Sequence, residues 1–404
     1  MAARPHYVIV AKGGASWLGG RQYSLNLIEA LIADRTHDDA YDVSVLVHGR
    51  DELVHYETVR PKLKACEDAT RLLRPWSMRN RARWKFKRQF FGATNPRLEE
   101  VLQGLNASFV YPATVAKIPS ADWISDFQYH HFPADMSAAE IADRTAEFSN
   151  IVNRARHVVL SSAAAARDCH ALFPQSAGRT SVLPFRVFAD PQWRIGDPLD
   201  IVRKYNLPER FALVSNWLLP TKNHSLVLDA LAQVPPKQRR TMRVVCTGDI
   251  YDYRNPGFYN VFLSKIHTLG LQDHVSVLGV IPKGDQIQLL RSALFYLQPS
   301  LSEGWNTGVE EARLFGKPIL LSDIAVHREQ NPPQVTYFDP RNPAELAAKL
   351  VAAFEPSSSK TFDTEQEDLA AKAYRQPQLD FAKTFRSIVN LVSGRIDAIR
   401  ASRS

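Results

Sequence analysis

The sequence predicts an α/β protein with two Rossmann-like domains of the parallel-sheet kind. Three observations lead to this prediction. Strand patterns alternate with helical patterns through residues 6–183. A turn-rich stretch at 190–208 interrupts this alternation, and the same alternation starts again at Phe211. The chain has 404 residues, which is enough for two domains of ordinary size. We therefore expect domains at 1–195 and 205–375, followed by a C-terminal helical segment at 376–404.

The first half opens with a buried-strand pattern, a glycine-rich segment at 12–21 and an amphipathic helix. Ser161 and Ser162 precede an alanine-rich run and are good helix caps. The strands predicted in this half are 6–11, 42–48, 107–111, 122–124, 157–160 and 180–183. The predicted helices are 22–33, 139–155 and the one that follows Ser162 and ends near Pro174.

The second half repeats the pattern with shorter connections. Its predicted strands are 211–215, 242–247, 274–278, 293–298, 318–321 and 334–338. Two of its predicted helices end near Leu231 and near Ala293. The other four span 257–269, 307–315, 343–354 and 378–399. The last of these carries apolar residues on one face.

Residues 298–323 are the stretch with the clearest chemistry, because they form a strand, a polar turn, a helix and a strand. Thr307 is expected to cap the helix, and the free amides of residues 305–308 then point out of its end. Such an end suits an anion like a diphosphate. Glu303 and Glu311 lie on either side of it. Carboxylates beside a phosphate are favourable only where they bind hydroxyls, so we expect a polyol that carries a diphosphate.

Spacing alone leaves the alternative open that this is an ordinary βαβ connection with two solvated glutamates. Glu310 adds to the ambiguity, since it lies on the same turn.

The stretch resembles the Glu-x7-Glu motif of retaining, family-4-type glycosyltransferases. This resemblance implies that Glu311 holds the ribose of the nucleotide and that Glu303 contacts the donor sugar. It also implies that the backbone from Gly304 through Trp305, Asn306 and Thr307 binds sugar and phosphate. Lys222, near a helix start, matches the basic residue with which the family binds the donor phosphates; its alternative is a solvated lysine. Asn216 stands where the family often has an arginine, so an amide replaces a cation there.

The first domain carries two further matches. Gly19 and Gly20 resemble a glycine pair in the first loop of the family. His130 and His131 follow an Asp-Phe-Gln segment like that of some bacterial members, which place a histidine near the donor sugar. The alternative is that both histidines are surface residues of a loop, and the sequence does not decide which of the two would line the site.

Over nearly the whole chain the resemblance implies the GT-B architecture, with two domains facing each other across a cleft and a terminal helix crossing back to the first. It implies a hexosyltransferase-type enzyme (EC 2.4) that transfers a sugar from a nucleotide-diphosphate sugar to a hydroxyl acceptor with retention, without a metal or other cofactor. No Asp-x-Asp motif lies near the site. A nucleotide-sugar epimerase of similar fold and a non-catalytic nucleotide-sugar-binding subunit remain alternatives.

The net charge of +8 is concentrated in residues 60–97, which carry +10. Its densest part, 79–91, interleaves basic and aromatic residues, which suits an anionic membrane surface. The alternative is a solvated basic segment, and no recognition motif accompanies it to favour nucleic acid. Membrane docking would fit a lipid-linked acceptor in cell-surface polysaccharide or glycolipid assembly. We expect a cytoplasmic protein that can be peripheral at the inner membrane face, since no signal peptide or transmembrane segment is evident and the three cysteines lack metal or redox spacing.

Overall fold

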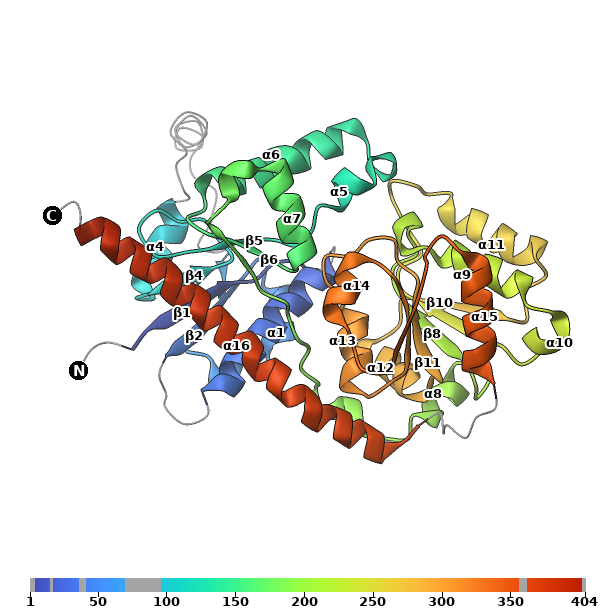
Figure 1. Cartoon of the computed structure of the whole chain (residues 1–404). Helices are drawn as coiled ribbons and strands as arrows, with labels where there is room; N and C mark the ends of the chain where they lie inside the picture. The colour runs from blue at the N-terminus through green and yellow to red at the C-terminus, as the bar shows by residue number, and fades with distance from the viewer. Residues whose placement is uncertain (1–3, 15–16, 36–40, 70–95, 356–361, 402–404) are drawn as a thin grey trace. The chain divides into compact units, whose positions relative to one another are not determined.

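The computed structural model describes residues 4–14, 17–35, 41–69, 96–355 and 362–401 (Figure 1). Contacts divide the chain into two compact units. Unit 1 comprises Met1–Asp126, Asp143–Phe188 and Pro377–Ser404, and unit 2 comprises Phe127–Ala142 and Ala189–Gln376. The segment 79–91, for which a membrane surface was predicted, lies outside the described residues. None of the described helices combines the length and apolar character that crossing a bilayer requires.

Unit 1 is built on parallel strands in the order β3-β2-β1-β4 and, in a second group, β5-β6-β7. A parallel bridge between Val110 and Ser120 links the two groups. The strands are β1 (His6–Val10), β2 (Asp42–Val47), β3 (Ala65–Asp68), β4 (Phe109–Tyr111), β5 (Asp122–Ile124), β6 (Val158–Leu160) and β7 (Thr180–Val182). The helices of this part of the chain are α1 (Leu18–Asp34), α4 (Pro96–Gly104), α6 (Ala138–Arg154) and α7 (Ala163–Leu172).

The core of unit 1 includes the C-terminal end of the chain. The Tyr7 ring of β1 stacks on Tyr41, with 4.8 Å between ring centroids. Phe385, from the last helix, is fully buried and meets the rings of Tyr7, Phe109 and Tyr111 edge-on. Aromatic pairs in this geometry add about 0.5–1.5 kcal/mol each beyond the area they bury. Residues at the two ends of the chain therefore stabilise the same sheet.

Unit 2 holds a six-stranded parallel sheet in the order β10-β9-β8-β11-β12-β13. The order reverses between β8 and β11, and such a point is where ligands bind at the carboxyl ends of the strands of doubly wound sheets. The strands are β8 (Ala212–Ser215), β9 (Val244–Thr247), β10 (Val275–Gly279), β11 (Phe295–Gln298), β12 (Ile319–Ser322) and β13 (Val335–Phe338). The principal helices are α5 (Gln128–His131), α8 (Leu199–Lys204), α9 (His224–Gln233), α10 (Pro236–Arg239), α11 (Phe258–Thr268), α12 (Lys283–Ser292), α13 (Thr307–Leu314), α14 (Ala325–Gln330) and α15 (Pro343–Phe354).

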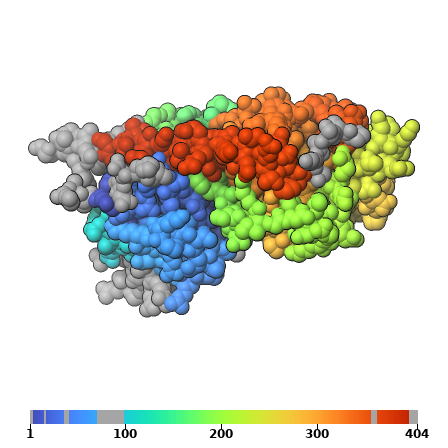
Figure 2. All heavy atoms as spheres, turned by 90° about the horizontal axis from the view of Figure 1, so that it is seen from below, coloured from blue at the N-terminus to red at the C-terminus, as the bar shows by residue number. Residues whose placement is uncertain are grey.

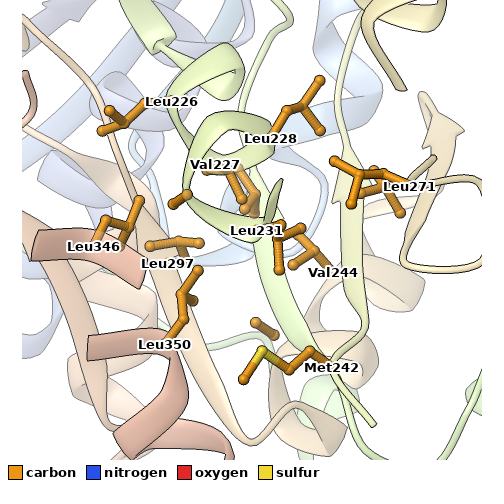
Figure 3. Packing of buried hydrophobic residues seen from close by; sticks show 14 of the residues in the cluster. Leu226, Val227, Leu228, Leu231, Met242, Val244, Leu271, Leu297, Leu346 and Leu350 are labelled. Atoms are coloured by element: carbon orange, nitrogen blue, oxygen red, sulfur yellow. The ribbon is translucent and has the colours of Figure 1, made fainter. Parts of the chain in front are cut away.

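One hydrophobic cluster fastens α9 to the sheet of unit 2 (Figure 3). Leu231 of α9 is fully buried, together with Leu297 of β11 and Leu346 and Leu350 of α15. Burying such a leucine is worth about 1.5–3 kcal/mol relative to leaving it exposed. The cluster thus holds the start of α9, which follows Lys222, in a fixed position on the sheet.

The predicted α/β class is confirmed, since both sheets are parallel and helices alternate with the strands along the chain. The predicted strands match the observed ones to within a few residues, and Ser162 caps α7 by accepting a hydrogen bond from the Ala165 amide. Six elements were not predicted from the sequence, because they are short or begin in polar segments: β3, α4, α5, α8, α10 and α14.

Two helices are longer than predicted. α1 begins at Leu18 rather than residue 22, so Gly19 and Gly20 belong to its first turn and not to a loop. α16 (Thr364–Ala401) begins well before residue 378 and continues through Pro377; it is the red helix in Figures 1 and 2. A proline inside a helix removes one backbone hydrogen bond. Buried side chains on both sides of it, Tyr374 and Phe381, hold this helix together by packing.

Candidate active site

The site is organised around the start of α13 in unit 2. Asn306, not Thr307, caps this helix: its side-chain oxygen accepts a hydrogen bond from the Val309 amide at 3.0 Å. The prediction of Thr307 as the cap was wrong by one residue, and asparagine is among the best capping residues. The Thr307 and Gly308 amides are the first of the helix and have no carbonyl of a preceding turn to bond. The Asn306 amide, in contrast, donates to Gln330 Oε1 at 3.3 Å and is not free.

Position 308 requires glycine because the backbone there lies very close to the side chain of Tyr296. A Cβ atom at this position would lie 2.1 Å from the Tyr296 hydroxyl oxygen, so no larger residue fits without displacing Tyr296. Tyr296 comes from β11 and donates to the Ser215 carbonyl at 3.3 Å. The first turn of α13 therefore rests directly on the sheet at the reversal of strand order.

Glu303 accepts four hydrogen bonds through a single oxygen, Oε1. The donors and their distances are Lys222 Nζ at 2.6 Å, Ser300 Oγ at 2.8 Å, Asn306 Nδ2 at 3.0 Å and Gln298 Nε2 at 3.1 Å. The carboxylate is largely buried, with 9% of its side chain exposed. An ionised group in such a place is stable only because it is paired and hydrogen-bonded. The network fixes the orientation of this carboxylate beside a lysine.

The turn that carries Lys222 is tied to the loop that carries Glu303. Asn223 adopts a left-handed conformation, with φ of 59°, which asparagine tolerates better than most residues. Its side chain donates to the carbonyls of Pro299 and Pro340 at 3.1 and 2.9 Å. The Leu301 amide donates to the Thr221 carbonyl at 2.8 Å. Lys222 and Glu303 are thus set by two backbone segments that are bonded to each other.

Asn216 is also part of this arrangement. It lies just after β8 and hydrogen-bonds the side chain of Gln298, which in turn donates to Glu303. The amide at this position is therefore engaged with a second amide within the protein. The structure brings together four of the predicted residues: Lys222, Glu303, Asn306 and Asn216.

Glu311 and Glu310 have different environments, which removes the ambiguity between them. Glu311 is 1% exposed and accepts from Lys283 Nζ at 2.5 Å and from Gln286 Nε2 at 3.3 Å. Glu310 is fully buried and accepts from the Tyr374 hydroxyl at 2.5 Å and from Gln330 at 3.1 Å. Glu310 therefore links α13 to α16 and is a structural residue.

Tyr296 lies within the electrostatic reach of both predicted acids. Burial raises the pKa of its hydroxyl far above its ordinary value, and the charges of Glu311 and Glu303 raise it further. Both carboxylates therefore act on one fixed ring, which lies beneath the first turn of α13.

The two predicted histidines and the predicted glycine pair belong to other segments of the chain. His130 and His131 are exposed on α5, in unit 2, with their rings edge to face at 5.5 Å. Gln128 of the same helix donates to Thr221, next to Lys222, at 2.8 Å. Gly19 and Gly20 lie in unit 1. A Cβ atom on Gly20 would be 2.7 Å from the Trp17 ring, so this glycine makes room for an indole.

Sequence reasoning missed several residues that shape the site, namely Asn223, Lys283, Gln298, Ser300 and Gln330. Ser300 and Gln298 belong to the predicted segment 298–323, but only the folded turn shows that both donate to Glu303. Lys283 is the first residue of α12, and its ammonium lies 5.6 Å from the centre of the Trp193 ring. In the described part of the chain, no group of three or more His, Cys, Asp or Glu side chains is arranged to hold a metal ion.

His327 is connected to the loop that carries Glu303 through Ser322. Its Nδ1 lies 3.0 Å from both Ser322 Oγ and the Ser322 carbonyl oxygen, and Ser322 Oγ donates to the Ser300 carbonyl at 2.6 Å. Its Nε2 is buried and has no hydrogen-bond partner among the described residues. Burial lowers the pKa of His327 to about 4, although the charge of Glu303 opposes this shift. The imidazole is therefore neutral in the folded protein at neutral pH.

Acid should destabilise unit 2 through this histidine. Its pKa is lower in the folded state than its ordinary value of 6.5, so the unfolded chain binds more protons below pH 6.5. The contribution of neutral His327 to the free energy of unfolding is complete above pH 6.5 and is lost as the pH falls toward 4. At pH 5 the loss is about 2 kcal/mol. Urea unfolding at pH 7 and pH 5 measures it. His327→Asn should show a smaller loss than the unmodified protein, and an equal loss in both would contradict the assignment.

Comparisons with known proteins were made on the sequence and on the fold. Residues 200–375 match the family model of glycosyl transferases group 1. A search of curated protein sequences finds no match. The Anabaena protein HepE, solved in complex with UDP, matches with a TM-score of 0.63 at 18% identity, covering 96% of this chain and 100% of its own. A glycosyltransferase from Rickettsia africae matches with a TM-score of 0.66 at 14% identity, covering 96% and 98%.

A third match is WaaG, described as a glycosyltransferase involved in lipopolysaccharide biosynthesis. Its TM-score is 0.58 at 14% identity, and the match covers 96% of this chain and all of WaaG. At these identities the structural likeness defines the fold, which is GT-B. The GT-B fold and the family match together make this chain a glycosyltransferase. Its residues 200–375 carry the match to the glycosyl transferases group 1 family.

Proposed function

We propose that the chain transfers a hexosyl group from a UDP-sugar to a hydroxyl of a saccharide or glycolipid, with the donor bound at the start of α13. The observation that carries this proposal is the pair of buried acids, Glu303 and Glu311, each held by a lysine near helix amides that lack partners in the helix. UDP is the first nucleotide to test, since HepE was solved with UDP and with UDP-glucose. The likeness to WaaG favours a role in cell-surface polysaccharide or glycolipid assembly.

The arrangement assigns a role to each charged group. Lys222 and the amides of Thr307 and Gly308 would bind the diphosphate, and Glu311 would accept hydrogen bonds from the ribose hydroxyls. Glu303 would accept hydrogen bonds from hydroxyls of the donor sugar. Asn216, Gly304, Trp305 and Asn306 would complete the donor side, and His130 or His131 of the same unit would be a further contact.

Each of the two acids is paired with a lysine. Lys222 neutralises Glu303, and Lys283 neutralises Glu311. When a donor binds, Lys222 would turn its ammonium toward the diphosphate, while Glu303 keeps its bonds from Gln298, Ser300 and Asn306. The carboxylate therefore remains hydrogen-bonded throughout, and its free oxygen is available for sugar hydroxyls.

The reaction itself requires stabilisation of a leaving diphosphate. The bond between the anomeric carbon and the diphosphate oxygen breaks, the acceptor oxygen bonds to the same face of that carbon, and the acceptor proton is released. Negative charge grows on the diphosphate as the bond breaks. A lysine and two fixed amides aimed at that charge lower the barrier because they need little reorganisation. In this site the groups that would supply this stabilisation are Lys222 and the amides of Thr307 and Gly308.

The neighbouring glutamates offer a matched test of the donor site. Glu311→Ala should weaken UDP binding by about 10- to 100-fold, because a charge-assisted hydrogen bond contributes roughly 1.5–3 kcal/mol. Glu310→Ala should leave UDP affinity nearly unchanged but lower the free energy of unfolding by about 1–3 kcal/mol, because Tyr374 and Gln330 lose a buried acceptor. Isothermal titration calorimetry and urea unfolding of both variants separate the two roles. Equal UDP affinity of the Glu311 variant and the unmodified protein would reject the proposed site.

A further inference from the structure

Unit 2 contains a cavity that Glu303 and Glu311 do not line, which we call the Asp135 pocket. It has a volume of about 450 Å³, within the range of small-molecule sites. One wall comes from the segment after α5 and includes Asp135, Ser137 and Glu140. The opposite wall is the loop after β9, with Asp252, Tyr253 and Asn255. Nothing in the donor site as described uses these residues.

The walls of this pocket are ordered by their own hydrogen bonds. Glu140 accepts from the Ser137 amide and hydroxyl, and from the Tyr253 hydroxyl at 2.7 Å, which joins the two walls. Asp252 accepts from the Arg254 amide at 3.1 Å and from its guanidinium at 2.9 Å. The pocket is therefore formed before any ligand arrives, which lowers the entropic cost of binding.

The carboxylate of Asp135 differs from those of Glu140 and Asp252 in its hydrogen bonding. It is half-buried in the pocket wall, and no hydrogen bond within the described residues reaches it. Burial raises its pKa, and the nearby charge of Asp252 raises it further, while Arg254 opposes both. A half-buried carboxylate in this position is stabilised by a ligand that donates hydrogen bonds, as hydroxyl and ammonium groups do.

The pocket also presents an aromatic surface. Tyr253 is 62% exposed although it is a large side chain, and the Arg254 guanidinium lies 5.6 Å from its ring centre. Exposed aromatic rings that are held in place offer apolar area at low conformational cost. A ring beside carboxylates and an amide matches a sugar, which has an apolar face and an edge of hydroxyls.

The charge of the pocket restricts the kind of sugar. Three carboxylates face one guanidinium, so a ligand with its own carboxylate or phosphate would be repelled. The pocket also adjoins the proposed donor site, since Pro220 of its wall and Lys222 belong to the same 3₁₀ turn (Pro220–Lys222). Lys222, which we assign to the donor diphosphate, does not line the Asp135 pocket. The ligand of this pocket is therefore a molecule other than the donor diphosphate.

We propose that the Asp135 pocket binds the saccharide ring of the acceptor, and that this ring is neutral or carries an ammonium group. The identification of this ring as the acceptor rests on the proposed glycosyl transfer. Asp135 accepts hydrogen bonds from the ring substituents, Tyr253 packs against its apolar face, and Asn255 provides an amide at the edge.

Three sugars with one ring shape and different charges test the proposal: glucosamine, glucose and glucuronate. Ligand-observed NMR titrations of the full chain near pH 6, in the presence of UDP, should rank their affinities in that order. Asp135→Asn should weaken glucosamine binding about tenfold, and Tyr253→Ala should weaken all three sugars. Asp273→Asn is the control, because it removes one exposed carboxylate of unit 2 outside the pocket. Thermal unfolding checks that each variant is folded.

The outcomes separate this proposal from the donor site. If UDP binds but no sugar binds, or glucuronate binds as well as glucosamine, the pocket is not an acceptor site of this kind. If sugar binding responds to Glu303→Gln but not to Asp135→Asn, the sugar occupies the donor site and the proposal is also overturned. If UDP itself fails to bind, the proposed function fails, whereas the ranking of the three sugars still tests the pocket as a saccharide site.

Discussion

Replacing Lys222 by methionine should lower kcat for release of UDP from UDP-glucose by roughly 100- to 1,000-fold. Removing one fixed donor from a developing negative charge costs about this much in other enzymes. Methionine keeps the length of the side chain and removes only the ammonium group. UDP affinity should fall as well, because the ground-state diphosphate also loses a cation. The measurement is steady-state release of UDP, with affinity from calorimetry.

The fold should survive this replacement. Glu303 keeps three other donors, so its carboxylate is not left unpaired. Lys265→Met is the matched control, because it removes one lysine of unit 2 whose ammonium pairs with Asp229 at 2.7 Å. A Lys222 variant with kcat within threefold of the unmodified protein would show that this lysine does not act on the leaving group.

Replacing Arg291 by methionine should destabilise unit 2 by about 3–5 kcal/mol. Arg291 is 2% exposed on α12, and its guanidinium pairs with Glu367 of α16, which is 4% exposed, at 3.0 to 3.2 Å. It also donates to the Trp193 carbonyl and to Gln288. Removing one partner of a buried ion pair leaves an uncompensated charge, which is the source of the cost. Urea unfolding at pH 7 measures the change.

The paired replacement is the control for this prediction. Arg291→Met combined with Glu367→Leu removes both charges and should recover most of the lost stability, because two apolar side chains need no compensation. The recovery is a coupling energy of the two positions. If the double variant is as unstable as the sum of the two single variants, the pair does not act as a unit, and packing rather than charge explains the cost.

The spacing of two glutamates indicates one candidate donor site, and the role of the two acids there stays a prediction. A strand, a turn and a helix of ordinary length can place Glu303 and Glu311 in only a few ways, and the structure sets both around Tyr296. The same local reasoning located Lys222 at the end of a turn. It misplaced the helix cap by one residue, since Asn306 and Thr307 are both acceptable caps and only the fold selects between them.

Long-range contacts were beyond prediction from one sequence. Glu310 and Glu311 are adjacent in the chain, but Glu310 meets Tyr374, 64 positions further along, and no periodic pattern indicates that pairing. The assignment of residues 127–142 to a compact unit also depends on contacts between distant parts of the sequence. The sequence predicted a first domain of 1–195, whereas contacts group this segment with 189–376. Gln128 and Thr221 make one of the bonds involved, across 93 positions.

The position of Phe385 has a consequence for how the chain is made. The strands of unit 1 leave the ribosome early, yet their core lacks the ring that meets Tyr7, Phe109 and Tyr111 until residue 385 has been added. Unit 2 has every one of its own segments by residue 376. The half of the protein that is translated first is therefore the half whose interior is completed last.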